Sequence, residues 1–275
     1  MIVKFISRRR WLKKIFKNFL PDECSHKLYG KHEFYYDPRD LRGPSFHFAY
    51  DLEEGFENYE KESKLELLEH IPQEGVFYDI GANIGLFSYF FALKRPKAKF
   101  FCFEPEPVVF NCLKKSFSHL DAPKVKIFNS AVGTVEESRK LFKSDINDGG
   151  HTLVKELIGD EERADQRVVE VINLDQRFQK GELPAPDAIK IDVEGFELEV
   201  LKGISTMVRT ARPSLLIECS NGDLADKGPF FELLKTFEGI KAKIPGQEGF
   251  LNLEELSAYA KSRTNVPLEN YLFVF

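Results

Sequence analysis

The 275-residue sequence has few of the side chains that hold small disulfide-linked or zinc-binding domains together. Its four cysteines are scattered and form no Cys-x-x-Cys pair; they are Cys24, Cys102, Cys112 and Cys219. Neither a zinc site nor a disulfide framework is therefore expected. We interpret the thiols as buried or incidental side chains in a reducing compartment.

The sequence also lacks a long apolar run, because no stretch reaches the roughly 18 residues of a membrane-spanning helix. Residues 1–20 contain seven Lys or Arg and no acid, and do not resemble a signal peptide. Trp11, Ile15 and Phe19 recur at helical spacing, which predicts a basic amphipathic helix. Its apolar face is expected either to pack on the domain or to lie on an anionic membrane surface. We expect a cytoplasmic protein, peripheral at the inner membrane surface in the second case.

A strong positive charge is absent as well. The net charge is −5 and the pI is about 5.8, so bulk attraction to nucleic acid is not expected. Hydrophobic residues make up 43% of the chain, including 26 Phe, which is enough for one large α/β domain. We predict that residues 1–60 form the basic helix and an irregular extension of short strands or loops. Residues 61–275 are predicted to form the main domain.

A regular alternation of strands and helices begins at residue 76. Apolar runs predict strands at 76–80, 99–103 and 125–128, with helices between them at 86–93 and 107–120. This order predicts the first half of a doubly wound parallel sheet. Residues 133–168 are expected to be loop-like around a polar insert at 144–152. Further strands are predicted at 167–174, 188–192, 214–218, 240–244 and 271–275, and further helices at 59–71, 197–207 and 230–237.

The turn after the strand at 76–80 is the first candidate for a ligand site. Asp79 lies at the end of the strand, and Gly81 and Gly85 flank the turn before a helix. Glycines permit positive φ and close approach of a ligand, and a helix N-terminus offers free N–H groups. Glu104 lies 19 residues after Gly85, at the end of the next strand, where a carboxylate can accept hydrogen bonds from both hydroxyls of a ribose. These residues predict a nucleoside-bearing cofactor.

The turn differs from the fingerprint of the dinucleotide-binding oxidoreductases. It reads Gly-Ala-Asn-Ile-Gly at 81–85, without the central glycine that lets a pyrophosphate sit close. Asp79 would repel a pyrophosphate, but it suits the amino group of a methionine moiety. The turn therefore favours S-adenosylmethionine over NAD.

Together with later segments, the turn resembles the FkbM-type family of S-adenosylmethionine-dependent methyltransferases. The most specific segment reads Ile-Lys-Ile-Asp-Val-Glu-Gly-Phe-Glu at 189–197, and the others are 77–88, 103–107, 129–133, 201–203, 214–218 and 271–275. The resemblance covers roughly residues 75–220. It implies a Rossmann-like class I methyltransferase fold, with a seven-stranded, mostly parallel sheet, an antiparallel last strand and helices on both faces.

The resemblance also implies roles for particular residues. Asp79, Gly81 and Asn83 would contact the methionine part of the cofactor, and residues near Ser130 and Ala131 would border its adenine. Members of the family commonly methylate hydroxyl groups of sugars or natural products. A small-molecule or glycan hydroxyl is therefore the expected acceptor.

Four residues are candidates for the acceptor side. Asp192, Glu194 and Glu218 lie at the ends of strands that face the expected cleft, and His151 lies in the polar insert. An alcohol has a high pKa, so a general base or a metal must help to remove its proton, and a neutral imidazole suits this task. Asp192 and Glu218 stand where carboxylates can hold a divalent ion. The sequence does not decide whether the site binds a metal, and no residue is assigned as a metal ligand. Lys190, on the same strand, is interpreted as a satisfied edge cation.

We therefore predict an O-methyltransferase. One alternative is an N-methyltransferase, or a protein or RNA methyltransferase, on the same fold. The acidic balance and the lack of an Asn-Pro-Pro-Tyr-like tetrapeptide after the strand at 188–192 argue against nitrogen targets. The other alternative is a non-catalytic module that keeps the cofactor fold for membrane or protein interaction. The basic helix supports it, whereas the intact turn and the strand-end acids argue against it.

Overall fold

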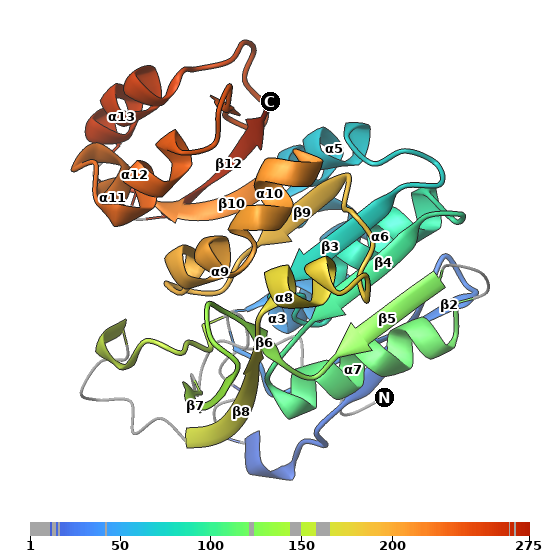
Figure 1. Ribbon diagram of the computed structural model, residues 1–275. Helices are drawn as coiled ribbons and strands as arrows, with labels where there is room; N and C mark the ends of the chain where they lie inside the picture. The colour runs from blue at the N-terminus through green and yellow to red at the C-terminus, as the bar shows by residue number, and fades with distance from the viewer. Residues whose placement is uncertain are drawn as a thin grey trace.

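The computed structural model describes residues 12, 15, 17–41, 43–120, 124–143, 150–157, 166–263, 265–266 and 268–275. Its centre is a seven-stranded sheet in the order β11-β12-β10-β9-β3-β4-β5 (Figure 1). The strands from β10 to β5 pair in parallel, and β12 runs antiparallel to both of its neighbours. The predicted mostly parallel sheet with an antiparallel last strand is confirmed. The strands are β3 (Val76–Ile80), β4 (Lys99–Phe103), β5 (Lys124–Phe128), β9 (Ala188–Ile191), β10 (Ser214–Ser220), β11 (Lys241–Lys243) and β12 (Leu268–Val274).

Helices cover both faces of this sheet, which explains why its central strands are apolar at nearly every position. Phe77 points to one face and packs with α5 (Lys61–Glu69), α6 (Leu86–Lys94) and α7 (Pro107–Ser118). Tyr78 points to the other face. The helices there are α8 (Leu174–Gln179), α9 (Glu197–Gly203), α10 (Ser205–Ala211), α11 (Asn221–Ala225), α12 (Pro229–Lys235) and α13 (Leu253–Ser262). The single helix expected at 197–207 is in fact α9 and α10, which meet at Ile204.

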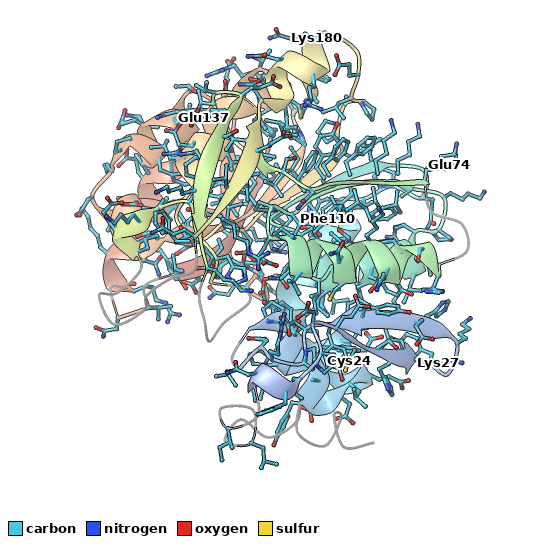
Figure 2. All side chains as sticks on the ribbon, turned by 90° about the horizontal axis from the view of Figure 1, so that it is seen from below. Cys24, Lys27, Glu74, Phe110, Glu137 and Lys180 are labelled. Atoms are coloured by element: carbon cyan, nitrogen blue, oxygen red, sulfur yellow. The ribbon has the colours of Figure 1, made fainter. Side chains whose placement is uncertain are left out.

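The N-terminal region adds a hairpin and two helices. The hairpin consists of β1 (Cys24–Leu28) and β2 (His32–Tyr36), and it lies along α7, as Figure 2 shows for β1 at Cys24 and Lys27. The expectation of only strands or loops up to residue 60 is wrong for α3 (Pro44–Asp51) and α4 (Glu53–Asn58). Tertiary packing stabilises these short helices: the ring of Phe34 lies 4.7 Å from Phe48 and 5.1 Å from Tyr89.

A second, three-stranded sheet follows the first half of the fold. It contains β6 (Ala131–Val132), β7 (Glu137–Phe142) and β8 (Gln166–Ile172), in the order β6-β8-β7. The loop-like expectation for residues 133–168 is wrong at β7, whose first four residues are not buried and therefore carry no strand-like apolar alternation. Residues 144–149 of the polar insert lie outside the described residues.

The basic helix predicted for residues 1–20 falls mostly on residues that the structure does not describe. Ile15 and Phe19 of its expected apolar face are 61% and 84% exposed, whereas Leu20 is buried. Packing of this face on the domain or on a membrane stays a prediction. Over the described ranges, no helix has the length and apolar character needed to cross a membrane.

Candidate active site

The carboxyl ends of β3, β4, β9 and β10 meet at one edge of the sheet. The amides of Gly81 and Ala82 both donate to the carbonyl of Phe103 at 3.0 Å, and the amide of Asp192 donates to the carbonyl of Ile80 at 3.0 Å. The chain leaves β3 toward β4 on one side, and β9 lies on the other, so this is the switch point where such sheets bind ligands. A cavity at this switch point is lined by residues that follow β3 and β4 and by residues at the ends of β9 and β10.

Both predicted glycines of the turn are required by the backbone. Gly81 has a φ of 80°, and an added Cβ would lie 1.8 Å from the carbonyl oxygen of Asp192. Gly85 has a φ of 88°, and its Cβ would lie 2.5 Å from Leu113 Cδ1 on α7. Gly81 and Asn83 line the cavity. Gly85 instead begins α6 and lets it pack closely on α7.

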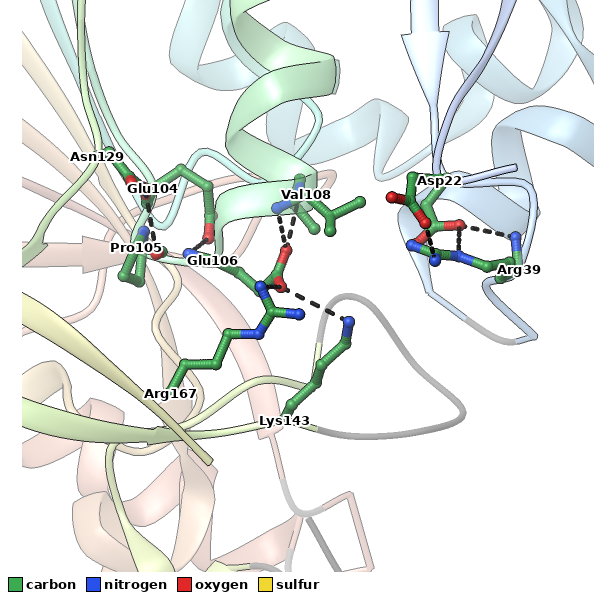
Figure 3. Close-up of polar contacts among 11 residues, drawn as sticks. Asp22, Arg39, Glu104, Pro105, Glu106, Val108, Asn129, Lys143 and Arg167 are labelled. Atoms are coloured by element: carbon green, nitrogen blue, oxygen red, sulfur yellow. Dashed lines mark hydrogen bonds and ion pairs between the residues drawn. The ribbon is translucent and has the colours of Figure 1, made fainter. Parts of the chain in front are cut away.

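Glu104 follows the last residue of β4 and lines the cavity, and Figure 3 shows its polar contacts. Its carboxylate accepts from the amide of Asn83 at 2.9 Å and from the amide of Glu106 at 2.8 Å. Burial raises the pKa of Glu104 to about 8, although these two amides oppose the shift. The carboxylate is thus fixed in place beside the turn, where it can accept hydrogen bonds from a ribose.

Glu106 supports the same loop and was not singled out from the sequence. Its buried carboxylate caps α7 by accepting from Val108 and Val109 amides at 2.7 and 2.9 Å. Lys143 and Arg167 approach it at 3.6 and 3.8 Å (Figure 3). An acid before Pro107 at the first helical position is a helix-start signal that could have identified this cap.

Asp79 lies beneath the turn and is fully buried. Ser88 donates a hydrogen bond to Oδ2, while Oδ1 has no hydrogen-bond partner among the described residues. Burial raises the pKa of Asp79, and Lys190 opposes the shift. A small hollow is lined by Asp79, Gly81, Asn83 and Lys190. The unpartnered oxygen suits an ammonium group, because a buried acceptor without a partner is costly.

The two residues expected near an adenine differ in position. Ala131 lines the main cavity together with Phe103 and Leu141, which gives this end an apolar surface. Ser130 is buried beside it without being part of the lining, and its Oγ has no partner in the described part of the chain.

The three predicted acids come together on the opposite side of the cavity. One carboxylate oxygen from each of Asp192, Glu194 and Glu218 lies within 4.8 Å of the others. Burial and then Asp192 raise the pKa of Glu194 from 4.5 to about 8, and the same causes raise the pKa of Glu218. Such a group offers the oxygen ligands that divalent cations take. One of these carboxylates can equally accept the proton that a bound hydroxyl group loses.

Lys190 is not the edge cation that the sequence suggested. Its strand β9 lies between β3 and β10, and Nζ is 2.7 Å from Asp192 Oδ2. Burial alone would lower the pKa of Lys190, but Asp192, Asp79 and Glu60 together raise it above its ordinary value. The ammonium therefore balances carboxylates on both sides of the site.

His151 lines the same cavity. The loop that carries it is fixed to the acidic side, because Thr152 Oγ1 donates to the carbonyl of Glu194 at 2.6 Å. Burial lowers the pKa of His151 to about 4, so the imidazole is neutral near pH 7. A group with this pKa is a weaker base than Glu194.

Tyr59 and Glu60 also line the cavity, and no sequence pattern had identified them. They form the turn between α4 and α5, where Glu60 adopts a φ of 44°. Asn270 Nδ2 donates to Glu60 Oε2 at 2.8 Å. The turn carries no motif, so only the packing of α4 and α5 brings it to the site.

Comparison with known proteins identifies the family of this chain. The family model of the methyltransferase FkbM domain matches residues 79–242. Methyltransferase sdnD of Sordaria araneosa is 29% identical over 194 residues, which cover 58% of this chain and 75% of that protein. Hexuronic acid methyltransferase AglP of Haloferax volcanii is 28% identical over 147 residues, which cover 52% of this chain and 56% of that protein.

Solved structures include a methyltransferase FkbM from Methylobacillus flagellatus, which aligns with a TM-score of 0.47 and 15% identity over 84% of this chain and 52% of that chain. The sheet order of the present chain independently gives the Rossmann-like class I arrangement that the resemblance implied. The family match spans more than half of the sequence and includes the turn, β4, β9 and β10. The chain belongs to the FkbM family of methyltransferases.

Proposed function

We propose that this methyltransferase uses S-adenosylmethionine to methylate a hydroxyl group of a sugar, a glycan or a small natural product. One observation carries the proposal: a single cavity has Gly81, Asn83 and Glu104 on one side and Asp192, Glu194 and Glu218 on the other. The first group suits a nucleoside cofactor, and the second suits an acceptor that must lose a proton.

The residues of the turn fit S-adenosylmethionine. Asp79 would hold its amino group with the unpartnered Oδ1, and Glu104 would accept hydrogen bonds from its ribose. The apolar surface at Ala131 and Phe103 would border the adenine. When bound, the cofactor supplies a methyl group that its sulfonium charge has already activated.

The acceptor residues act on the hydroxyl. Glu194, with a pKa of about 8, is matched to accept a proton near neutral pH, when the acceptor oxygen forms its new bond to carbon. Asp192 and Glu218 would orient the acceptor by accepting hydrogen bonds from neighbouring hydroxyls. Correct alignment of the reacting atoms supplies several kcal/mol of the barrier.

The charge of the acceptor side supports an uncharged small acceptor over a nucleic acid. Glu60, Asp192, Glu194 and Glu218 all line this side of the cavity, and a phosphate backbone would find no Lys or Arg among the described residues of the lining. The relative AglP is a hexuronic acid methyltransferase, which favours a carbohydrate acceptor here but says nothing for an uncharged one, because a hexuronic acid carries a carboxyl group.

Two measurements test the proposal. Titration calorimetry with S-adenosylmethionine should show binding, and no binding at millimolar cofactor would defeat the proposal. A screen with labelled cofactor should then transfer the label to sugars, lipids or polyketide-like alcohols, with Mg²⁺ in one arm and EDTA in the other. NMR of the product should place the new methyl on oxygen, whereas a methyl on nitrogen would overturn the O-methyl assignment.

A further inference from the structure

We infer that a groove formed by α3 and α4 is a second binding site for the acceptor, and that it holds an uncharged sugar ring linked to the one that is methylated. The inference rests on the proposed function, because it assigns the substrate class of the same active site. Both helices precede residue 79, where the match to the family begins, so the groove lies outside the matched domain.

Aromatic side chains form one wall of the groove, which has a volume of about 460 Å³. Phe46 and Tyr50 lie one helical turn apart on α3, with ring centroids 5.9 Å apart and planes inclined by 36°. Tyr50 is 58% exposed. Together the two rings present an open apolar surface, and the C–H face of a pyranose ring packs on such a surface.

Hydrogen-bonding groups surround these rings. Asp51, Glu54 and Asn58 line the groove, and carboxylate and amide oxygens accept hydrogen bonds from sugar hydroxyls. None of the described residues that line the groove is Lys or Arg, so a polyanion would meet only repulsion. A hydrocarbon chain would displace the water molecules that hydrogen-bond to the two carboxylates. It offers no donor to replace them, so its binding would carry a desolvation cost. An uncharged sugar satisfies both kinds of surface.

Tyr59 connects the groove to the active site, because it lines both. Its ring lies 5.8 Å from that of His47 in the groove. Tyr59 and Glu60 both line the cavity, and burial followed by Glu60 and Asp192 raises the pKa of Tyr59 well above its ordinary value. The groove and the cavity are therefore adjacent and share one side chain as a wall. The inferred acceptor of two or more rings would place one ring on each side of Tyr59.

The test compares acceptors of different length. The full-length protein is given labelled S-adenosylmethionine with free hexoses and with uncharged di- to tetrasaccharides that end in the same hexoses. We expect the longer acceptors to have the lower KM. Tyr50→Ala should raise the KM of the longer acceptors by about tenfold, the loss of one stacking contact. The same variant should leave the kcat of the longer acceptors unchanged, and it should change neither the KM nor the kcat of the free hexoses.

Matched variants separate this effect from a loss of folding. Tyr50→Phe keeps the ring and should keep the low KM, whereas Asp51→Ala removes the acceptor oxygens and should raise the KM of the longer acceptors only. Phe250→Ala removes a ring that is 53% exposed and does not line the groove, and it should change nothing.

The outcomes are distinct. Equal KM values for hexoses and oligosaccharides would overturn the inference, as would a length preference that survives both Tyr50→Ala and Asp51→Ala. Transfer only to charged sugars or to alcohols that are not sugars would also overturn it, while leaving methyl transfer intact. Absence of cofactor binding would instead defeat the proposed function, and the inference with it.

Discussion

Lys190 Nζ lies 2.7 Å from Asp192 Oδ2, so a cation inside the sheet holds an acid at the end of the same strand. The lysine side chain is only 5% exposed, and it also acts on Asp79 and Glu60. Because Asp79 lies under the turn at 81–85 and Asp192 lies on the opposite side of the cavity, one ammonium stabilises the charges of both halves of the site.

Replacing Lys190 by Met should destabilise the protein in a pH-dependent way. Without the ammonium, the pKa of buried Asp79 rises further, so the folded state binds a proton that the unfolded state has lost. Stability should then fall as pH rises, with a loss of about 3 kcal/mol near pH 8 and a smaller loss at pH 5. Urea unfolding at both pH values measures this. Lys97→Met, at an exposed ion pair, is the control and should have almost no effect. An equal loss at both pH values would contradict the charge argument.

Gly81→Ala should cost more than an alanine at another glycine of similar φ. Gly81 has a φ of 80° and would place Cβ 1.8 Å from the Asp192 carbonyl oxygen, whereas Gly181 has a φ of 72° with nothing within 4 Å of its Cβ. Both variants carry the backbone strain of about 1 kcal/mol, but only Gly81→Ala must also separate the turn from β9. Chemical denaturation of the two variants measures the difference. Equal losses would show that close approach of β9 is unimportant.

Glu104→Ala should weaken binding of S-adenosylmethionine. Each charge-assisted hydrogen bond to the ribose is worth roughly 1.5–3 kcal/mol, so above pH 8, where Glu104 is ionised, the Kd should rise by about 10-fold to 100-fold. Asn83 lines the cavity, so its amide can reach water, whereas the Glu106 amide is buried and loses its partner, which should cost about 1–3 kcal/mol of stability. Calorimetry provides the Kd, and Glu74→Ala, at a side chain that is 77% exposed, provides the control. An unchanged Kd would remove Glu104 from the cofactor site.

Glu194 should control two pH dependences. Its pKa rises from 4.5 to about 8 on folding, so the folded state retains a proton between these values and stability falls as pH rises through this window. Turnover should rise toward pH 8 as the carboxylate becomes able to accept a proton. Glu194→Gln should make the stability profile less steep, with Glu104 and Glu218 still titrating in this range, and should reduce turnover at every pH, while exposed Glu62→Gln should do neither. A variant that keeps both wild-type profiles would exclude Glu194 as the base.

His151→Gln should lower turnover without changing the shape of its pH profile. The pKa of His151 is lowered to about 4, so the imidazole stays neutral between pH 6 and 9 and only its hydrogen bonding is lost. Cofactor affinity should stay near the wild-type value. Turnover measured across this range is the test, and full retention of turnover would remove His151 from the mechanism.

Much of the site could be predicted because parallel strands leave their carboxyl ends at one edge. The strand at 76–80 and the segment at 189–197 were recognisable in the sequence, so Asp79, Glu104, Asp192 and Glu218 could be placed near one another without coordinates. The residues from the N-terminal region could not. Tyr59 and Glu60 lie in a turn between two short helices, whose position depends on aromatic packing between Phe56 and Tyr89.

The sequence by itself determined the strands of the main sheet and the glycine turn, because apolar periodicity and glycine spacing are local properties of the chain. The motif segments, above all the one at 189–197, carried the resemblance to the family. Only the tertiary structure decided the electrostatics and the walls of the site. Lys190 has the same sequence context whether it faces solvent or a buried acid, and its role follows from the strands on either side of β9. The groove on α3 and α4 likewise exists only because side chains distant in sequence pack these helices beside the carboxyl ends of the strands.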